Sequence, residues 1–187
     1  MTRKQALEIL TELGNSPNML KHALACEAAM KTLHPKLAIN QNSLTEEDWG
    51  IVGLLHDADY EATGKSLETH TDKVTEKLKT LNVKQEIIDA IRGHCDKAPR
   101  DTLAAKAIFA LDELTGLIVA VALVMPDKKL SSVSVESVLK KFSEPRFAAG
   151  ANREQIKTCE TELKIPLPNF IEITLKSIQE ISDDLGL

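Results

Sequence analysis

Apolar residues recur every three or four positions through most of the chain, a spacing that places them on one face of an α-helix. This pattern predicts helices over residues 3–13, 19–33, 43–57, 66–81, 82–94, 102–125, 135–142, 152–163 and 168–186. Thr2 with Gln5 and Ser43 with Glu46 have the spacing of a capping box, and Asn82 can cap the helix that follows it. Because β-branched residues rarely alternate with polar ones, the sequence predicts an all-α protein.

The length of the chain, 187 residues, suits a single-domain helical bundle. After Pro126 the sequence becomes more polar and richer in serine. We therefore expect residues 1–125 to form the helical core, and residues 126–187 to form a C-terminal helical extension that packs on the same domain.

Composition narrows the class of protein. Hydrophobic residues make up 43% of the chain and aromatic residues only 3%, so the core must be aliphatic. A net charge of −5 argues against nonspecific nucleic-acid binding, which needs a basic face. Three cysteines without a pairing pattern fit a reducing compartment, and the apolar run at residues 114–126 is too short to span a bilayer. We expect a cytoplasmic protein without a membrane or nucleic-acid partner.

His56 and Asp57 close an apolar run that begins at Trp49. The other candidate ligands are His22, His70 and His94, each on the apolar face of a predicted helix, and Asp112 in the middle of the most apolar one. Taken singly, a histidine of this kind is a core residue bonded to a carbonyl, and Asp112 is equally explained by a salt bridge. Together, we expect them to converge inside the bundle and to bind manganese, iron, nickel or zinc.

His34 stands apart from this set. It precedes Pro35 at the predicted end of a helix, where a surface or C-terminal capping role is expected.

The order His22, His56-Asp57, His70, His94, Asp112 resembles the HD-domain superfamily of metal-dependent phosphohydrolases, over residues 19–121. It is most similar to the small single-domain, HDIG-like members with two metals. The resemblance implies that His22, His56, Asp57 and Asp112 hold one metal. It also implies that His70 and His94 hold a second, with Asp57 as the bridge.

The chain departs from the HDIG pattern at two places. Ala58-Asp59-Tyr60 stands where HDIG proteins have Ile-Gly-Lys after the His-Asp pair, and the first available lysine is Lys65. Cys95 stands where many members have a second histidine after the one that matches His94.

The expected function is that of a phosphomonoesterase or phosphodiesterase that uses a metal-activated hydroxide on a nucleotide or another small phosphorylated metabolite. Asp59 is a candidate general acid or base, or else a helix-terminal hydrogen-bonding residue. Lys65, Arg92 and Lys106 are candidates for neutralising phosphate oxygens. Two alternatives are a di-iron oxygenase of the same superfamily, which would cleave C–C or C–P bonds, and a non-catalytic binding module stabilised by metal.

Overall fold

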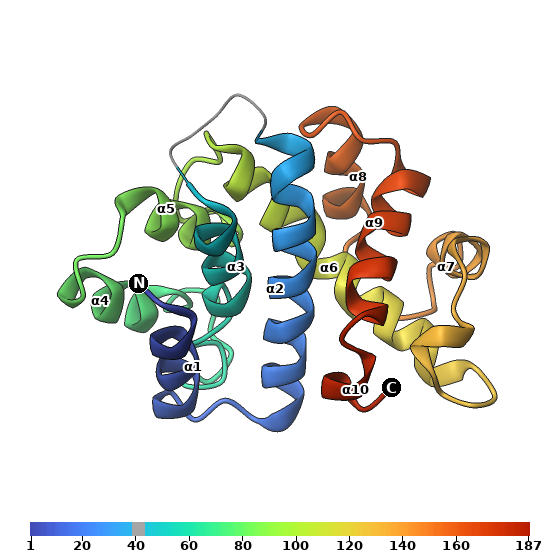
Figure 1. Cartoon of the computed structure of the whole chain (residues 1–187), viewed down its shortest axis with the longest axis horizontal. Coiled ribbons are helices and arrows are strands. Elements are labelled where there is room, and N and C mark those ends of the chain that lie inside the picture. Colours follow the sequence, from blue (N-terminus) through green and yellow to red (C-terminus); the bar gives the residue numbers. More distant parts are fainter. Residues whose placement is uncertain (39–43) are drawn as a thin grey trace.

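The computed structural model describes residues 1–38 and 44–187 (Figure 1). Within these residues all the regular structure is helical, and there is no strand, which confirms the prediction of an all-α fold. The helices are α1 (Arg3–Glu12), α2 (Pro17–Leu37), α3 (Glu46–Leu55), α4 (Asp72–Thr80), α5 (Gln85–Gly93), α6 (Leu103–Val124), the 3-10 turn η1 (Leu130–Ser132), α7 (Val135–Phe142), α8 (Arg153–Thr161), α9 (Leu167–Gln179) and α10 (Ser182–Leu185).

Helices α2 and α6 form the centre of the molecule (Figure 1). Helix α3 packs along α2, while α5 and α8 pack on α6. Helix α9 packs on both α2 and α6, so the C-terminal helices share the core with the N-terminal ones. The domain boundary at residue 126 stays a prediction.

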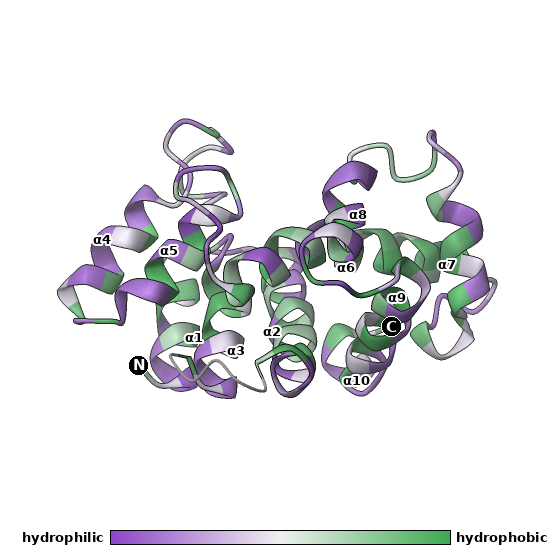
Figure 2. Ribbon diagram, turned by 90° about the horizontal axis from the view of Figure 1, so that it is seen from above, coloured by the Kyte–Doolittle hydropathy of each residue, from purple (hydrophilic) through white to green (hydrophobic). Residues whose placement is uncertain are grey.

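Helix α6 is the most apolar element of the bundle (Figure 2). By length and composition it is the one helix, among the residues that the structure describes, that could cross a membrane. Its neighbours α2, α5, α8 and α9 enclose it instead, and most of its apolar side chains are buried against them. Its apolar character is therefore that of a core helix.

The close packing of α2 and α3 depends on Gly53. A Cβ atom at this position would lie 2.6 Å from the backbone oxygen of Cys26, so no larger residue fits between the two helices. This contact sets the distance between His22 on α2 and His56 at the end of α3.

The first helix begins as predicted, with Thr2 and Gln5 in a capping box. Helix α3 differs, because its capping box is formed by Thr45 and Asp48. The Asp48 carboxylate accepts the N–H of Thr45 at 2.9 Å, and the Thr45 hydroxyl accepts the N–H of Asp48 at 3.2 Å. The predicted cap, Ser43, lies outside the described residues.

The prediction of a helix over residues 66–81 is wrong at its beginning. Helix α4 starts at Asp72, and Thr71 has a φ of +67°, which interrupts a helix. The cause is Asp59, whose carboxylate accepts the N–H groups of the first turn of α4 and pulls this turn toward it. As a result Leu67 is 73% exposed, and His70 lies in a turn rather than on a helix.

Three other predicted helix ends are also wrong. Helix α2 continues through Pro35 to Leu37, and the His34 ring meets the edge of Trp49 instead of capping the helix. Asn82 has a φ of +52°, unlike the extended backbone of an N-cap, and α5 begins three residues later. The last predicted helix is divided near Ile181 into α9 and α10, and Gly186 ends α10 in the left-handed conformation.

Candidate metal centre

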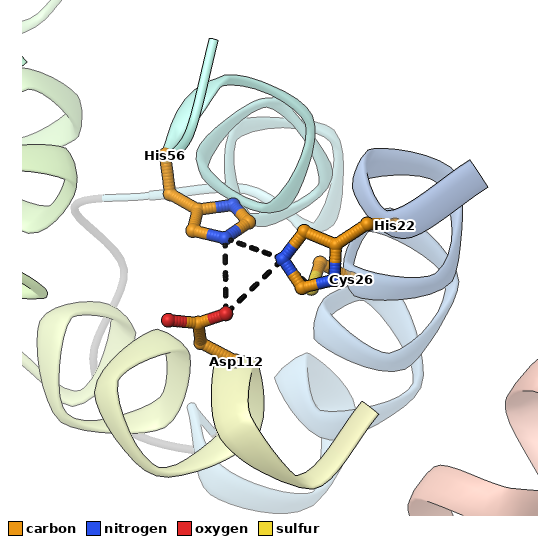
Figure 3. A group of neighbouring side chains, drawn as sticks. All are labelled: His22, Cys26, His56 and Asp112. Atoms are coloured by element: carbon orange, nitrogen blue, oxygen red, sulfur yellow. Dashed lines mark hydrogen bonds and ion pairs between the residues drawn. The ribbon is translucent and has the colours of Figure 1, made fainter. Parts of the chain in front are cut away.

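Three side chains from three elements meet at the first cluster (Figure 3). His22 comes from α2, His56 follows the last residue of α3, and Asp112 lies in the middle of α6. The Nε2 atoms of the two histidines are 3.1 Å apart. The Asp112 Oδ1 atom lies 3.1 Å from Nε2 of His22 and 3.4 Å from Nε2 of His56. The helices that carry these residues are the packed pair α2 and α3 and the central helix α6.

A second cluster lies beside the first. It consists of His70, from the turn before α4, and His94, which is the C-cap residue of α5. Their Nε2 atoms are 3.0 Å apart, and both rings are buried. Asp59 holds the segment that carries His70, because it binds both the first turn of α4 and the ring of His70.

Asp57 lies between the two clusters. Its Oδ1 atom is 3.0 Å from Nε2 of His70 and 3.3 Å from Nε2 of His94. Its Oδ2 atom is 3.7 Å from Nε2 of His22 and 3.8 Å from Nε2 of His56. One carboxylate thus presents one oxygen to each pair of imidazoles, which is the arrangement of a bridging ligand.

The hydrogen bonds of the outer ring nitrogens determine which nitrogens face inward. His56 Nδ1 lies 2.9 Å from the carbonyl of Gly53, and His94 Nδ1 contacts the carbonyl of Ile91. His70 Nδ1 lies 3.0 Å from a carboxylate oxygen of Asp59. Because carbonyl and carboxylate oxygens only accept, each Nδ1 must be the donor, and a neutral ring then presents the lone pair of Nε2.

His22 follows the same rule through Thr115. The Thr115 hydroxyl donates to the carbonyl of Asp112 at 2.8 Å, so its oxygen is free to accept the Nδ1–H of His22 at 3.3 Å. Cys26 lies behind the His22 ring, with its sulfur 3.9 Å from Nε2 (Figure 3).

This arrangement fits divalent metals. Lone pairs of imidazoles and carboxylates converge at 3.0–3.4 Å, without a hydrogen-bond donor between them, and only a positive charge can stabilise such a group. Metal-bound histidines likewise donate their second ring nitrogen to a carbonyl or a carboxylate. Imidazole with carboxylate suits manganese, iron, nickel or zinc.

The pKa values of Asp57 and His70 also indicate that the cluster is stabilised by positive charge. Burial raises the pKa of Asp57, but the imidazoles of His56, His70 and His94 outweigh it and hold this pKa well below its usual range. Burial lowers the pKa of His70, but Asp57 and Asp59 raise it to about 9. When no metal is bound, protons supply the positive charge, so metal binding must displace them.

The two clusters open into a cavity of about 810 Å³. Its wall includes residues of the predicted C-terminal extension: Ala148, Gly150, Ala151, Asn152 and Gln155. Gln155 donates to the carbonyl of Phe109 at 2.8 Å, and the N–H of Asn152 donates to Glu113 at 3.1 Å. The extension therefore completes the cavity.

Comparison with known proteins identifies the family. A family model described as the HD domain matches residues 19–117, which is more than half of the chain. The chain belongs to the HD domain family. HD domains are in general metal-dependent phosphohydrolases, and most members of the family are enzymes. No curated protein and no solved structure matches the chain significantly.

The structure of this HD domain brings the six predicted ligands together: His22, His56, Asp57, His70, His94 and Asp112. The residues predicted to face the substrate do not line the cavity. Asp59 is fully buried, and its two carboxylate oxygens accept hydrogen bonds from His70 and from the first turn of α4. These contacts match the alternative role of a helix-terminal hydrogen-bonding residue and not that of a general acid or base.

The three predicted phosphate-binding cations also lie away from the cavity wall. Lys65 is exposed, in a turn with a φ of +62°. Arg92 donates to Asp72 at 3.1 Å and to Thr75 at 3.3 Å. Lys106 is on α6 but does not line the cavity.

Several residues of the cavity wall were not predicted. Glu113 and Phe109 lie close to Asp112 on α6. Their short distance from Asp112 in the sequence could have identified them as residues of the site. Asn152 and Gln155 come from the C-terminal extension, and no spacing rule relates them to the ligands.

Proposed function

We propose that this HD domain is a metal-dependent phosphohydrolase that acts on a small phosphorylated metabolite, as a phosphomonoesterase or a phosphodiesterase. The observation that carries the proposal is the position of Asp57, with one oxygen toward His22 and His56 and the other toward His70 and His94. Two metals that share a carboxylate are the usual centre for displacement at phosphorus.

Each ligand has a role in this proposal. His22, His56 and Asp112 would hold one metal, His70 and His94 would hold the other, and Asp57 would contact both. Bound divalent metals polarise the phosphate and lower the pKa of a coordinated water, so that hydroxide is available at neutral pH. The protein keeps the rings in place through their Nδ1 hydrogen bonds, and Asp59 positions His70 in this way.

The wall of the cavity restricts the substrate. Among the described residues that line it, four are carboxylates (Asp57, Asp96, Asp112 and Glu113), and none is a lysine or an arginine. The metals therefore have to balance the phosphate charge alone. Additional phosphates would approach Glu113 without a cation to receive them, so we expect a substrate with one phosphate rather than a triphosphate.

The same lack of basic side chains supports a second candidate, a di-iron oxygenase of the superfamily acting on a substrate of low charge. Tyr60 lines the cavity and meets the edge of His70 with ring centres 5.3 Å apart. The bound metal distinguishes the two functions, because the oxygenase needs iron and consumes oxygen.

The decisive experiment measures phosphate release from nucleoside monophosphates, cyclic nucleotides and sugar phosphates by protein loaded with manganese, nickel, zinc or iron. We expect turnover with at least one ester, and its loss in Asp57→Asn, which cannot bridge two metals with negative oxygens. Oxygen uptake by the iron-loaded protein without phosphate release would instead establish the oxygenase. Full metal occupancy without either activity would establish a binding module.

A further inference from the structure

Cys95 lies beside the second cluster. It follows His94 directly and lines the cavity. The Cys95 sulfur and ring nitrogens of His70 and His94 all lie within 4.8 Å of one another. A sulfur and a nitrogen bound to the same zinc, at about 2.3 Å and 2.1 Å, are at most roughly 4.4 Å apart. The three ligand atoms thus lie near the separations of ligands that share one metal, and rotation of the Cys95 side chain is the movement that would bring its sulfur onto a metal held by the two histidines.

The contacts that Cys95 would give up are weak. Its thiol donates to the carbonyl of Arg92 at 3.4 Å, and its sulfur lies 3.6 Å from the hydroxyl of Thr71. Sulfur is a poor hydrogen-bonding atom, so little free energy opposes the rotation.

An independent observation points to a cation at this place. His70 is 2% exposed and His94 is 7% exposed, yet among the residues that the structure describes their Nε2 atoms contact each other and Asp57 alone. Both rings use Nδ1 as the donor, to Asp59 and to Ile91. Buried acceptors that point at one place without a donor require a metal or a proton there.

We propose that Cys95 is a thiolate ligand of the second metal. The second site is then a mixed site of two imidazoles, one carboxylate and one thiolate, and it prefers a thiophilic ion such as zinc, cobalt or iron over manganese. The first site, built from imidazoles and carboxylates, accepts a wider range of divalent metal ions. The inference rests on the proposed two-metal function, since it assigns a ligand within that centre.

Cys26 and Cys159 provide controls. The sulfur of Cys26 lies within the same 4.8 Å of ligand atoms of His22, His56 and Asp112 in the first cluster. Unlike Cys95, however, Cys26 is fully buried behind His22, does not line the cavity, and is 3.5 Å from the hydroxyl of Thr115. Cys159 is buried on α8 and belongs to neither cluster. Cys26→Ala and Cys159→Ala each remove one thiol and leave Cys95 in place.

The test uses full-length protein, stripped of metal and titrated with cobalt(II). The visible d–d bands report cobalt on any ligands, whereas a near-ultraviolet charge-transfer band reports a cobalt–thiolate bond. We expect this band in the wild type, in Cys26→Ala and in Cys159→Ala, and its loss in Cys95→Ala. We also expect Cys95→Ala to lower the preference of the second site for zinc over manganese by roughly tenfold or more.

Two results overturn the assignment: a thiolate band whose intensity is unchanged in Cys95→Ala, or no such band in wild-type protein that carries two cobalt ions. Zinc-edge X-ray absorption of the wild type, which needs no variant, must show one sulfur at about 2.3 Å for every two zincs, and a spectrum without sulfur also refutes it. Phosphate release, measured in parallel, separates this result from the proposed function. A protein that binds cobalt and releases phosphate without a thiolate band keeps the function and loses only the role of Cys95, whereas failure to bind two metals removes both.

Discussion

A methyl group at Gly53 tests how the packing of α2 and α3 supports the metal centre. In Gly53→Ala the new Cβ would lie 2.6 Å from the Cys26 carbonyl oxygen and 2.7 Å from the Glu27 backbone nitrogen. Ordinary contacts of a Cβ atom begin at 3.4 Å, so the helices have to separate by up to about 0.8 Å. Both obstructing atoms belong to the backbone, and no side-chain rotation relieves the clash.

The expected cost follows from overpacking. Inserting a methyl group into a closely packed region lowers the free energy of unfolding by about 1–3 kcal/mol. The higher helix propensity of alanine relative to glycine raises it by roughly 0.5–1 kcal/mol. The net loss in free energy of unfolding is about 1 kcal/mol at the middle of these ranges and about 2.5 kcal/mol at most, which lowers the melting temperature of a chain of this size by roughly 2–10 °C. The separation also moves His22 away from His56, whose Nε2 atoms are 3.1 Å apart, so metal affinity should fall.

Gly50→Ala is the matched control, one turn earlier on the same helix. The three atoms nearest to its Cβ would all belong to the side chain of Lys31, which is flexible and can move aside. We expect its stability to stay within about 1 kcal/mol of the wild type. Thermal unfolding followed by circular dichroism and zinc affinity measured against a chelator compare the two variants. Equal stability and equal affinity of Gly53→Ala and Gly50→Ala would refute the reasoning.

Three further predictions concern the site and the stability of α3. Asp57→Ala should bind neither metal tightly, lose phosphate release and lose the rise in melting temperature that metal gives to the wild type, because metal binding is linked to folding; elemental analysis that shows full occupancy would mean that Asp57 is not a ligand. The double variant of His70 and His94 to Ala should retain one metal and the helical fold, and an unchanged metal stoichiometry under metal-replete conditions would show that these histidines are structural. Burial raises the pKa of Asp48, but the Lys84 ammonium at 2.7 Å and the hydrogen bonds from the capping threonine outweigh it and lower this pKa. The stability that Asp48 contributes is therefore present above about pH 4 and lost as the pH falls through its folded-state pKa. Asp48→Asn should cost roughly 1–2 kcal/mol at pH 7 and less at pH 2, and an equal cost at both values in urea unfolding would contradict the role of the charge.

The convergence of the six side chains could be predicted from the sequence because polar side chains on apolar faces have few stable explanations. Asp112, in the middle of an apolar helix, needs a strong partner wherever that helix packs. His70 shows the limit of this reasoning. The helical pattern assigns it to a helix, but the carboxylate of Asp59, twelve residues before Thr71, binds the N–H of Thr71 and begins α4 at Asp72. His70 therefore lies near the other five side chains, as predicted, but in a turn before α4 and not on a helix.

The substrate side of the site could not be predicted in the same way. Lys65 and Arg92 are near the ligands in sequence, but the cavity wall is completed by a loop of the C-terminal extension. Arg153 shapes this loop by donating to the carbonyls of Phe147, Ala148 and Ala151. These contacts and the hydrogen bond from Gln155 to α6 depend on how distant helices pack, and no spacing in the sequence records them.

The central claim is that Asp57 joins two metal sites. Anomalous diffraction from crystals of the protein loaded with zinc or manganese tests it most directly. We expect two peaks about 3.5–4 Å apart, one beside His22, His56 and Asp112 and the other beside His70 and His94, with the Asp57 carboxylate between them. A single peak, or two peaks that do not share Asp57, would contradict it.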